Sequence, residues 1–144
     1  MTSAKKIKAI SEYTKLRNTM KWLPAASDDD VEELHDLAAD LSKLVGRDKT
    51  LNDTAEDMFK KGKLSLDEIV DAIGDVTRTL KAMPWLITPA YNDLNDGNGD
   101  WVNTANEIEN KLKKLPSAKQ KLLVDMYKTK KLSLDELLYE IQDL

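Results

Sequence analysis

Few side chains in this sequence are suited to catalysis or metal binding. His35 is the only histidine, and the chain contains no cysteine. General acid–base catalysis and zinc binding both need further groups of this kind, so we interpret His35 as a residue at the edge of the surface. The motifs of phosphate-binding loops, serine hydrolases and zinc proteases do not occur. The sequence therefore predicts no catalytic residue, no cofactor and no metal.

One acidic cluster lies beside glycines: Asp93, Asp96 and Asp100 flank Gly97 and Gly99. Such loops can hold calcium when oxygen ligands recur at fixed positions. With the first glycine at the sixth position of a calcium loop, a leucine falls at the third position and an asparagine at the twelfth. These two residues are Leu94 and Asn103. We interpret the segment as a solvated loop.

A turn that occurs twice carries the other candidate ligands. It reads Lys-Leu-Ser-Leu-Asp-Glu at 63–68 and again at 131–136. Counted from Asp57, Ser65 and Glu68 fall at positions nine and twelve of an EF-hand calcium loop, which the turn superficially resembles. Positions three and five need oxygen ligands, and in the first copy neither residue has a side-chain oxygen. The residues there are Phe59 and Lys61 in the first copy, and Tyr127 and Thr129 in the second. The pattern disfavours calcium.

Helix capping explains the residues that both turns share. Ser65 and Ser133 can accept hydrogen bonds from the first backbone N–H groups of a new helix. Glu68 and Glu136, three residues later, can accept from the N–H of the serine itself. The sequence predicts a capping box at each turn.

The similarity extends beyond the turn. When residues 125–144 are aligned on residues 57–76 without gaps, eleven of the twenty positions are identical. Each copy follows another amphipathic helix, at 28–45 and at 101–115. This pattern predicts two related three-helix units with a duplicated helix–turn–helix hairpin.

The predicted fold is all-α, a bundle of about seven helices in a single domain. Glycine and proline are few, at five and four residues, and apolar residues recur at spacings of three and four. The predicted parts are a basic N-terminal helix at 1–26, a first three-helix unit at 27–83, an irregular connector at 84–100 and a second three-helix unit at 101–144.

Particular residues are expected to begin the helices. Ser27, Thr50 and Asp100 are predicted N-caps, and Ser117 with Gln120 is predicted to form a further capping box. In the first helix, the predicted inward face consists of Ile7, Ile10, Tyr13, Leu16, Met20 and Leu23.

Charge is distributed unevenly along the chain, whose net charge is −4. Residues 1–22 contain six bases and one acid, whereas residues 28–40 contain seven acids and no base. Two solvated or mutually attracting helix faces are the simpler interpretation. The alternative is a basic helix that docks on an anionic partner. Its candidate contacts are Lys5, Lys8, Lys15 and Arg17.

The tryptophans suggest a second contact region. Trp22, Trp85 and Trp101 lie at predicted helix ends, where packing is the default role. The segment around Trp85 is apolar in what should be a loop, and exposed apolar residues usually mark interfaces. The candidate partner-binding residues here are Trp85, Leu86, Ile87 and Tyr91.

These observations favour a non-enzymatic protein–protein interaction module, such as a small inhibitor, adaptor or regulator. Small, acidic, cysteine-free helical inhibitors, including anti-defence proteins, are often encoded by phages and mobile elements. The chain shares these general features with them but no motif. The alternative is a helical nucleic-acid-binding regulator that uses the basic first helix. The acidic helices after each turn disfavour it. We expect a protein partner, no membrane and a cytoplasmic location, because the chain lacks cysteine, a signal peptide and a long apolar run.

Overall fold

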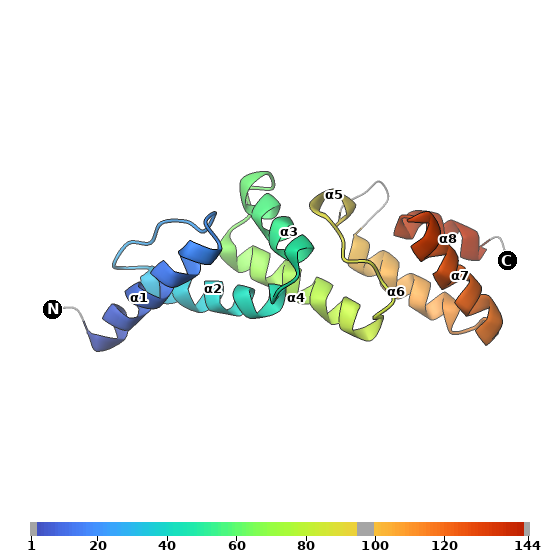
Figure 1. The fold of residues 1–144 in the computed structure, drawn as a ribbon, viewed down its shortest axis with the longest axis horizontal. Helices are drawn as coiled ribbons and strands as arrows, with labels where there is room; N and C mark the ends of the chain where they lie inside the picture. Colours follow the sequence, from blue (N-terminus) through green and yellow to red (C-terminus); the bar gives the residue numbers. More distant parts are fainter. Residues whose placement is uncertain (1–2, 95–99, 143–144) are drawn as a thin grey trace. The chain divides into compact units, whose positions relative to one another are not determined.

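The computed structural model describes residues 3–94 and 100–142. This part of the chain is helical, with eight helices, which confirms the all-α prediction (Figure 1). The helices are α1 (Ala4–Thr19), α2 (Val31–Val45), α3 (Lys49–Lys60), α4 (Leu66–Ala82), α5 (Tyr91–Leu94), α6 (Trp101–Leu112), α7 (Ser117–Lys130) and α8 (Leu134–Gln142). The short α5 lies in the segment predicted to be irregular.

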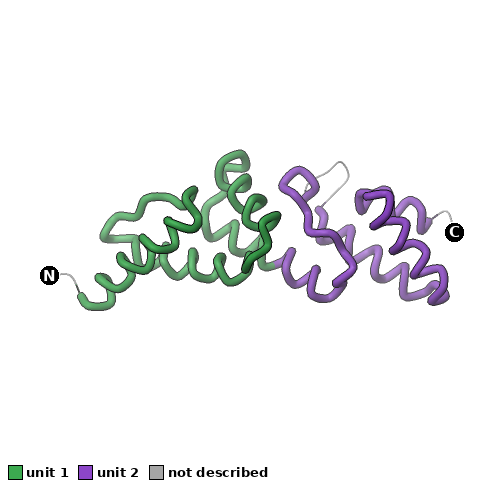
Figure 2. The backbone as a smooth tube through the Cα atoms, in the orientation of Figure 1, with its two compact units in different colours: residues 1–74 green, residues 75–144 purple. Residues whose placement is uncertain are grey.

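The chain divides into two compact units, residues 1–74 and 75–144 (Figure 2). The boundary falls inside α4, between Gly74 and Asp75. The sequence predicted a connector at 84–100 between two three-helix units, and that organisation stays a prediction. In the structure, α4 continues past the boundary to Ala82.

In the first unit, α1 packs mainly against α2. The inward residues of α1 are Ala9 and Tyr13, followed by Met20 and Leu23 beyond its end. Ile7 and Ile10 were predicted to face inward, but their exposed fractions are 58% and 38%. The error is physical: spacings of three and four fit two neighbouring stripes of this helix, and only packing selects between them.

In the second unit, α6 packs against α8. Trp101, Ala105, Ile108 and Leu112 are buried at spacings of four, three and four, as the sequence predicted. Leu137 of α8 is fully buried as well. This core supports the segment between α4 and α6.

Both predicted capping boxes are present. The N–H of Ser65 donates to Glu68 Oε1 over 3.1 Å, and the N–H of Glu68 donates to Ser65 Oγ over 3.2 Å. At Ser133 and Glu136 the same two distances are 3.0 and 3.2 Å. Asp100 also caps its helix, by accepting from the N–H of Val102 over 3.1 Å.

We expect Ser65→Ala and Ser133→Ala each to lower the free energy of unfolding by about 1 kcal/mol, because each removes one cap acceptor. Urea denaturation followed by circular dichroism measures both effects. Ser117→Ala serves as the control, and we expect it to change stability by less than about 0.5 kcal/mol. Equal losses in all three variants would contradict this account of the turn.

Three other predicted caps were wrong. Ser117 is the first residue of α7 after Pro116, and Gln120 donates to the carbonyl of Leu115 instead. Asp48, not Thr50, caps α3 by accepting from the N–H of Leu51. At Ser27 the hydroxyl donates to Asp30, and α2 begins only at Val31. These caps were wrong because neighbouring polar residues compete for the same backbone groups.

A left-handed residue precedes each capping box. Lys63 has φ of 58° and Lys131 has φ of 53°. Each lysine is the first residue of its Lys-Leu-Ser-Leu-Asp-Glu turn, so the two occupy the same position in the two copies. Lysine is strained there, and glycine is the usual residue at such a helix end.

The two units share a second motif. Met-x-Trp-Leu occurs at 20–23 and again at 83–86. Trp22 lies 5.6 Å from Phe59 between ring centroids, and Trp85 lies 5.6 Å from Tyr127. Phe59 and Tyr127 are each the third residue of the copies at 57–76 and 125–144. Each unit therefore contains its own tryptophan–aromatic pair, built from equivalent positions.

Candidate functional site

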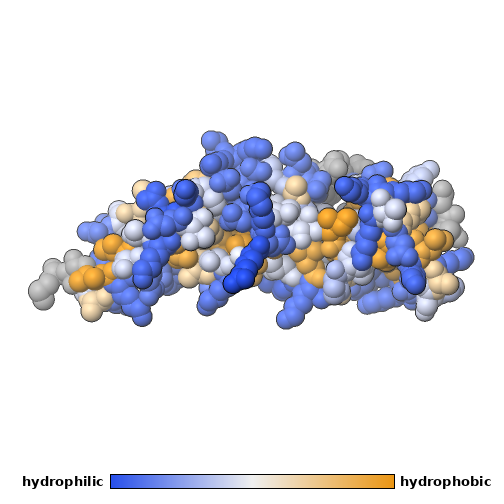
Figure 3. Space-filling model, in the orientation of Figure 1, coloured by the Kyte–Doolittle hydropathy of each residue, from blue (hydrophilic) through white to orange (hydrophobic). Residues whose placement is uncertain are grey.

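A groove of about 490 Å³ lies in the second unit. It is lined by the 87–93 segment, by Trp101 and Thr104 of α6 and by the α7–α8 turn. Trp101 and Leu134 are buried and form its apolar base. Figure 3 shows apolar surface over this part of the second unit, among hydrophilic side chains. The groove can accept an apolar group of the size of a side chain.

Tyr127 fixes one wall of the groove. The backbone N–H of Ile87 donates to Tyr127 Oη over 3.0 Å. The ring of Trp85 meets the ring of Tyr127 edge-on, at an interplanar angle of 89°. Tyr127 is buried, so these two contacts tie the loop after α4 to α7.

The four residues predicted in this loop have different environments. Ile87 is 45% exposed and lines the groove, while Leu86 is 7% exposed and belongs to the core. Leu86 therefore cannot act as an exposed anchor, which corrects that part of the prediction. Trp85 and Tyr91 are half-buried. The partner role of Trp85, Ile87 and Tyr91 stays a prediction.

The acidic and basic side chains at the rim of the groove differ in whether they already have partners. The carboxylate of Asp93 accepts from the N–H of Ala90 over 3.1 Å, and Glu136 is held in its capping box. Lys128 and Lys131 are exposed, and within the described residues neither forms an ion pair. Two lysines are therefore available at the rim, while two of the nearby acids are already engaged in hydrogen bonds.

Sequence reasoning did not identify Thr104, Lys128 or Lys131 as site residues. The groove brings together three segments that are distant in sequence, so a linear motif could not reveal it. One signal was present: the second Met-x-Trp-Leu motif, at 83–86, places the Trp85 loop inside a unit rather than between two units.

Burial raises the pKa of Tyr127 above its ordinary value of 10.0, an effect that the Ile87 hydrogen bond partly opposes. The folded state therefore holds the phenol proton more tightly than the unfolded state does. This contribution to stability is complete below pH 10 and is lost as pH rises through the raised pKa. The protein therefore loses stability through the ionisation of Tyr127 only at alkaline pH.

We expect Tyr127→Phe to lower the free energy of unfolding by about 1 kcal/mol at pH 7, because the N–H of Ile87 loses its acceptor. The variant should also lose less stability than the wild type between pH 9 and pH 11, as measured by urea denaturation. Tyr139→Phe is the control, since the side chain of Tyr139 is exposed. Identical alkaline profiles for all three proteins would contradict the prediction.

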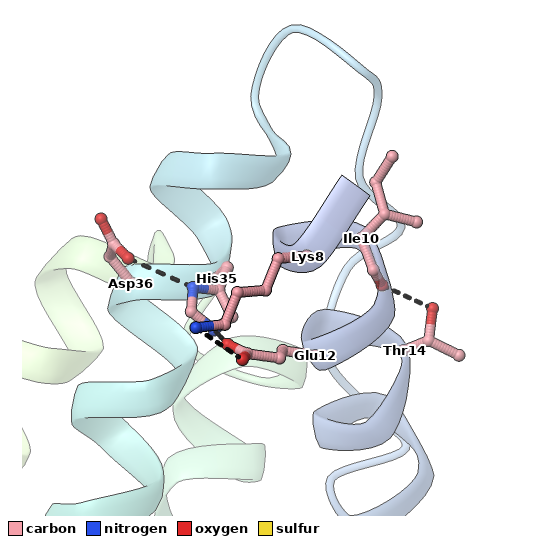
Figure 4. A network of polar contacts seen from close by, with 6 residues as sticks. All are labelled: Lys8, Ile10, Glu12, Thr14, His35 and Asp36. Atoms are coloured by element: carbon pink, nitrogen blue, oxygen red, sulfur yellow. Dashed lines mark hydrogen bonds and ion pairs between the residues drawn. The ribbon is translucent and has the colours of Figure 1, made fainter. Parts of the chain in front are cut away.

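His35 bridges α1 and α2 in the first unit (Figure 4). Its Nε2 lies 2.7 Å from Glu12 Oε2, and its Nδ1 lies 3.2 Å from Asp36 Oδ1. Lys8 also pairs with Glu12, over 3.8 Å. The imidazole is 19% exposed at its side chain, as expected for a residue at the edge of the surface. It connects two helices.

The four predicted basic contacts all lie on α1. Lys5 pairs with Glu32 over 3.9 Å, and Lys8 pairs with Glu12. Lys15 and Arg17 are exposed and, within the described chain, form no ion pair. Part of the basic charge therefore attracts the acidic second helix, and part of it faces solvent.

In the first turn that superficially resembles a calcium loop, two of the carboxylates already have partners. Hydrogen bonds from the backbone and side chain of Ser65 hold the pKa of Glu68 below its usual value. Asp57 pairs with Lys61 over 3.8 Å. Among the described residues, no group of three or more potential ligand side chains could hold a metal ion. Asp96 of the other acidic cluster lies outside the described residues.

Comparisons with known proteins give no relative: no family model, no curated protein and no solved structure matches the chain. Within residues 3–94 and 100–142, no helix combines the length and the apolar character that crossing a membrane requires. Function must therefore be argued from the chain itself.

Proposed function

We propose that this chain is a non-enzymatic protein-interaction module, such as a small inhibitor, adaptor or regulator, and that it binds its partner through the groove of the second unit. The observation that carries the proposal is the exposure of Ile87 beside an apolar base. Fully burying one isoleucine side chain contributes about 1.5–3 kcal/mol, and Ile87, at 45% exposure, forgoes somewhat less than half of this while the groove is open to water.

The first unit supports the same conclusion by comparison. Helices α2 and α6 each bury three residues at spacings of three and four. They are Ala38, Leu41 and Val45 in α2, and Ala105, Ile108 and Leu112 in α6. The exposed fractions are 0, 0 and 5% in both helices. In this register, Thr104 of the groove corresponds to Leu37 in the first unit. The second unit thus has a short side chain where the first has an isobutyl group.

The partner we infer is a protein that presents an aliphatic side chain to this space. An isobutyl group in the groove would contact Trp101, Leu134 and Ile87. A carboxylate beside that group on the partner could pair with Lys128 or Lys131.

The test is affinity capture from the native host with wild-type and variant chains, read by mass spectrometry. Thr104→Leu fills the groove with the residue of the first unit, and Ile87→Ser removes the exposed apolar wall. We expect both to reduce recovery of one dominant protein by at least about tenfold. Leu122→Ser is the control, because Leu122 is 67% exposed and lies outside the groove lining.

The proposal fails if all three variants recover the same protein equally well. It also fails if the wild type recovers nucleic acid in a salt-dependent manner and no dominant protein, which would favour the nucleic-acid-binding alternative.

A further inference from the structure

A second surface, independent of the groove, lies on α1. Ile7 and Ile10 are exposed by 58% and 38% and follow one another by a single helical turn. Arg17 continues the same face two turns later, and Lys8 and Lys15 flank it. Figure 3 shows apolar surface over the first helix, among hydrophilic residues. The outward face of α1 is therefore both apolar and basic.

The charge of this face is only partly neutralised within the first unit: Lys8 pairs with Glu12, whereas Lys15 and Arg17 form no ion pair in the described chain. Between Ala4 and Thr19 the helix carries five bases and one acid, Glu12. That single acid is already engaged with His35 and Lys8. A matching surface must supply carboxylates together with an apolar group.

The outward face of α8 has this composition. Tyr139 is 65% exposed, and Glu136 and Glu140 beside it are exposed as well. With Asp135, the helix carries three acids and no base between Leu134 and Gln142. In the described chain none of the three forms an ion pair. The exposed tyrosine of α8, beside acids that form no ion pair, therefore complements the exposed isoleucines of α1, which lie beside bases.

We propose that the outward face of α1 binds the α8 face of a second copy of this chain. Contacts between two α1 faces would bring bases together, and contacts between two α8 faces would bring acids together, so like-charge repulsion disfavours both. The contact is therefore heterologous, with different surfaces on the two copies. It is small, so it forms at high protein concentration and weakens with salt.

Sedimentation equilibrium of the whole chain between about 10 μM and 1 mM tests the contact. We expect the weight-average mass to rise above the monomer mass of 16.3 kDa and to fall again in about 1 M salt. The double variant Ile7→Ser/Ile10→Ser should weaken association at least about tenfold, while Leu122→Ser should leave it unchanged. Circular dichroism checks that each variant is folded, since all three side chains are exposed.

A charge exchange identifies the two faces. Lys15→Glu/Arg17→Glu on α1 and Asp135→Lys/Glu140→Lys on α8 should each reduce association alone. Mixing the two variants should restore it, because the unchanged α8 of one then meets the unchanged α1 of the other, and the two exchanged faces are complementary as well. A monomer at every concentration overturns the proposal, and so does a mass increase that the mixture does not restore. Asp135 and Glu136 of this α8 face also line the groove. Thr104→Leu and Ile87→Ser change neither α1 nor a charge of α8, so they should leave this association unchanged, and the two proposals can fail separately.

Discussion

Replacing Trp22 by alanine should lower the free energy of unfolding by about 3–5 kcal/mol, the loss typical of a buried aromatic side chain. Trp22 is 7% exposed and packs against Phe59 at 5.6 Å. Its removal leaves a cavity at the end of α1, where Met20 and Leu23 are buried too. Because small proteins are stable by only about 5–15 kcal/mol, the first unit would become marginal.

Trp85→Ala is the matched comparison, since Trp85 holds the equivalent place beside Tyr127. Trp85 is half-buried, so we expect about half the loss. Trp22→Phe keeps an aromatic ring but replaces the indole by a smaller phenyl group, and it breaks no hydrogen bond because the indole N–H has no partner in the described chain; the lost volume should cost about 1–2 kcal/mol. Equal losses for Trp22→Ala and Trp85→Ala, measured by urea denaturation, would contradict the burial argument.

The second large effect is expected at the centre of the other unit. Leu137→Ala should cost about 2–5 kcal/mol, because Leu137 is fully buried where α6 and α8 pack together. Ile69→Ala, at the equivalent place in the first unit, should cost a similar amount since Ile69 is also fully buried. Thermal or urea unfolding followed by circular dichroism measures both.

Two controls separate packing from helix propensity. Leu137→Met conserves volume and should cost less than about 1.5 kcal/mol. Leu122→Ala removes an exposed leucine and should change stability by about 0.5 kcal/mol or less. If Leu122→Ala were as destabilising as Leu137→Ala, the assignment of the core would be wrong.

Local interactions were predictable from the sequence. The capping boxes at Ser65 and Ser133 need only four consecutive residues, and their hydrogen bonds formed as expected. The α6 stripe from Trp101 to Leu112 was also predicted, because a strongly amphipathic helix leaves one choice of inward face. Such features depend little on the rest of the chain.

Tertiary choices were not predictable in the same way. Ile7 and Ile10 are exposed, and the buried residues of α1 are Tyr13, as predicted, and Ala9, which was not predicted. The hydroxyl of Tyr13 also donates a hydrogen bond to the carbonyl of Pro24.

The candidate site was predicted only in part, for the same reason. Ile87 was identified because four mostly apolar residues in a loop are unusual. Thr104 and Lys131 could not be, since a threonine within α6 and a lysine in a turn carry no signal until the fold brings them beside Ile87.

The passage of α4 through the unit boundary has a consequence for folding. Starting a helix is costly, whereas extending one adds a hydrogen bond for each residue that is fixed. The turns of α4 before Gly74 can therefore nucleate the turns after Asp75, so formation of the first unit lowers the barrier to starting the second. We expect hydrogen-exchange protection along α4 to change together on the two sides of Gly74.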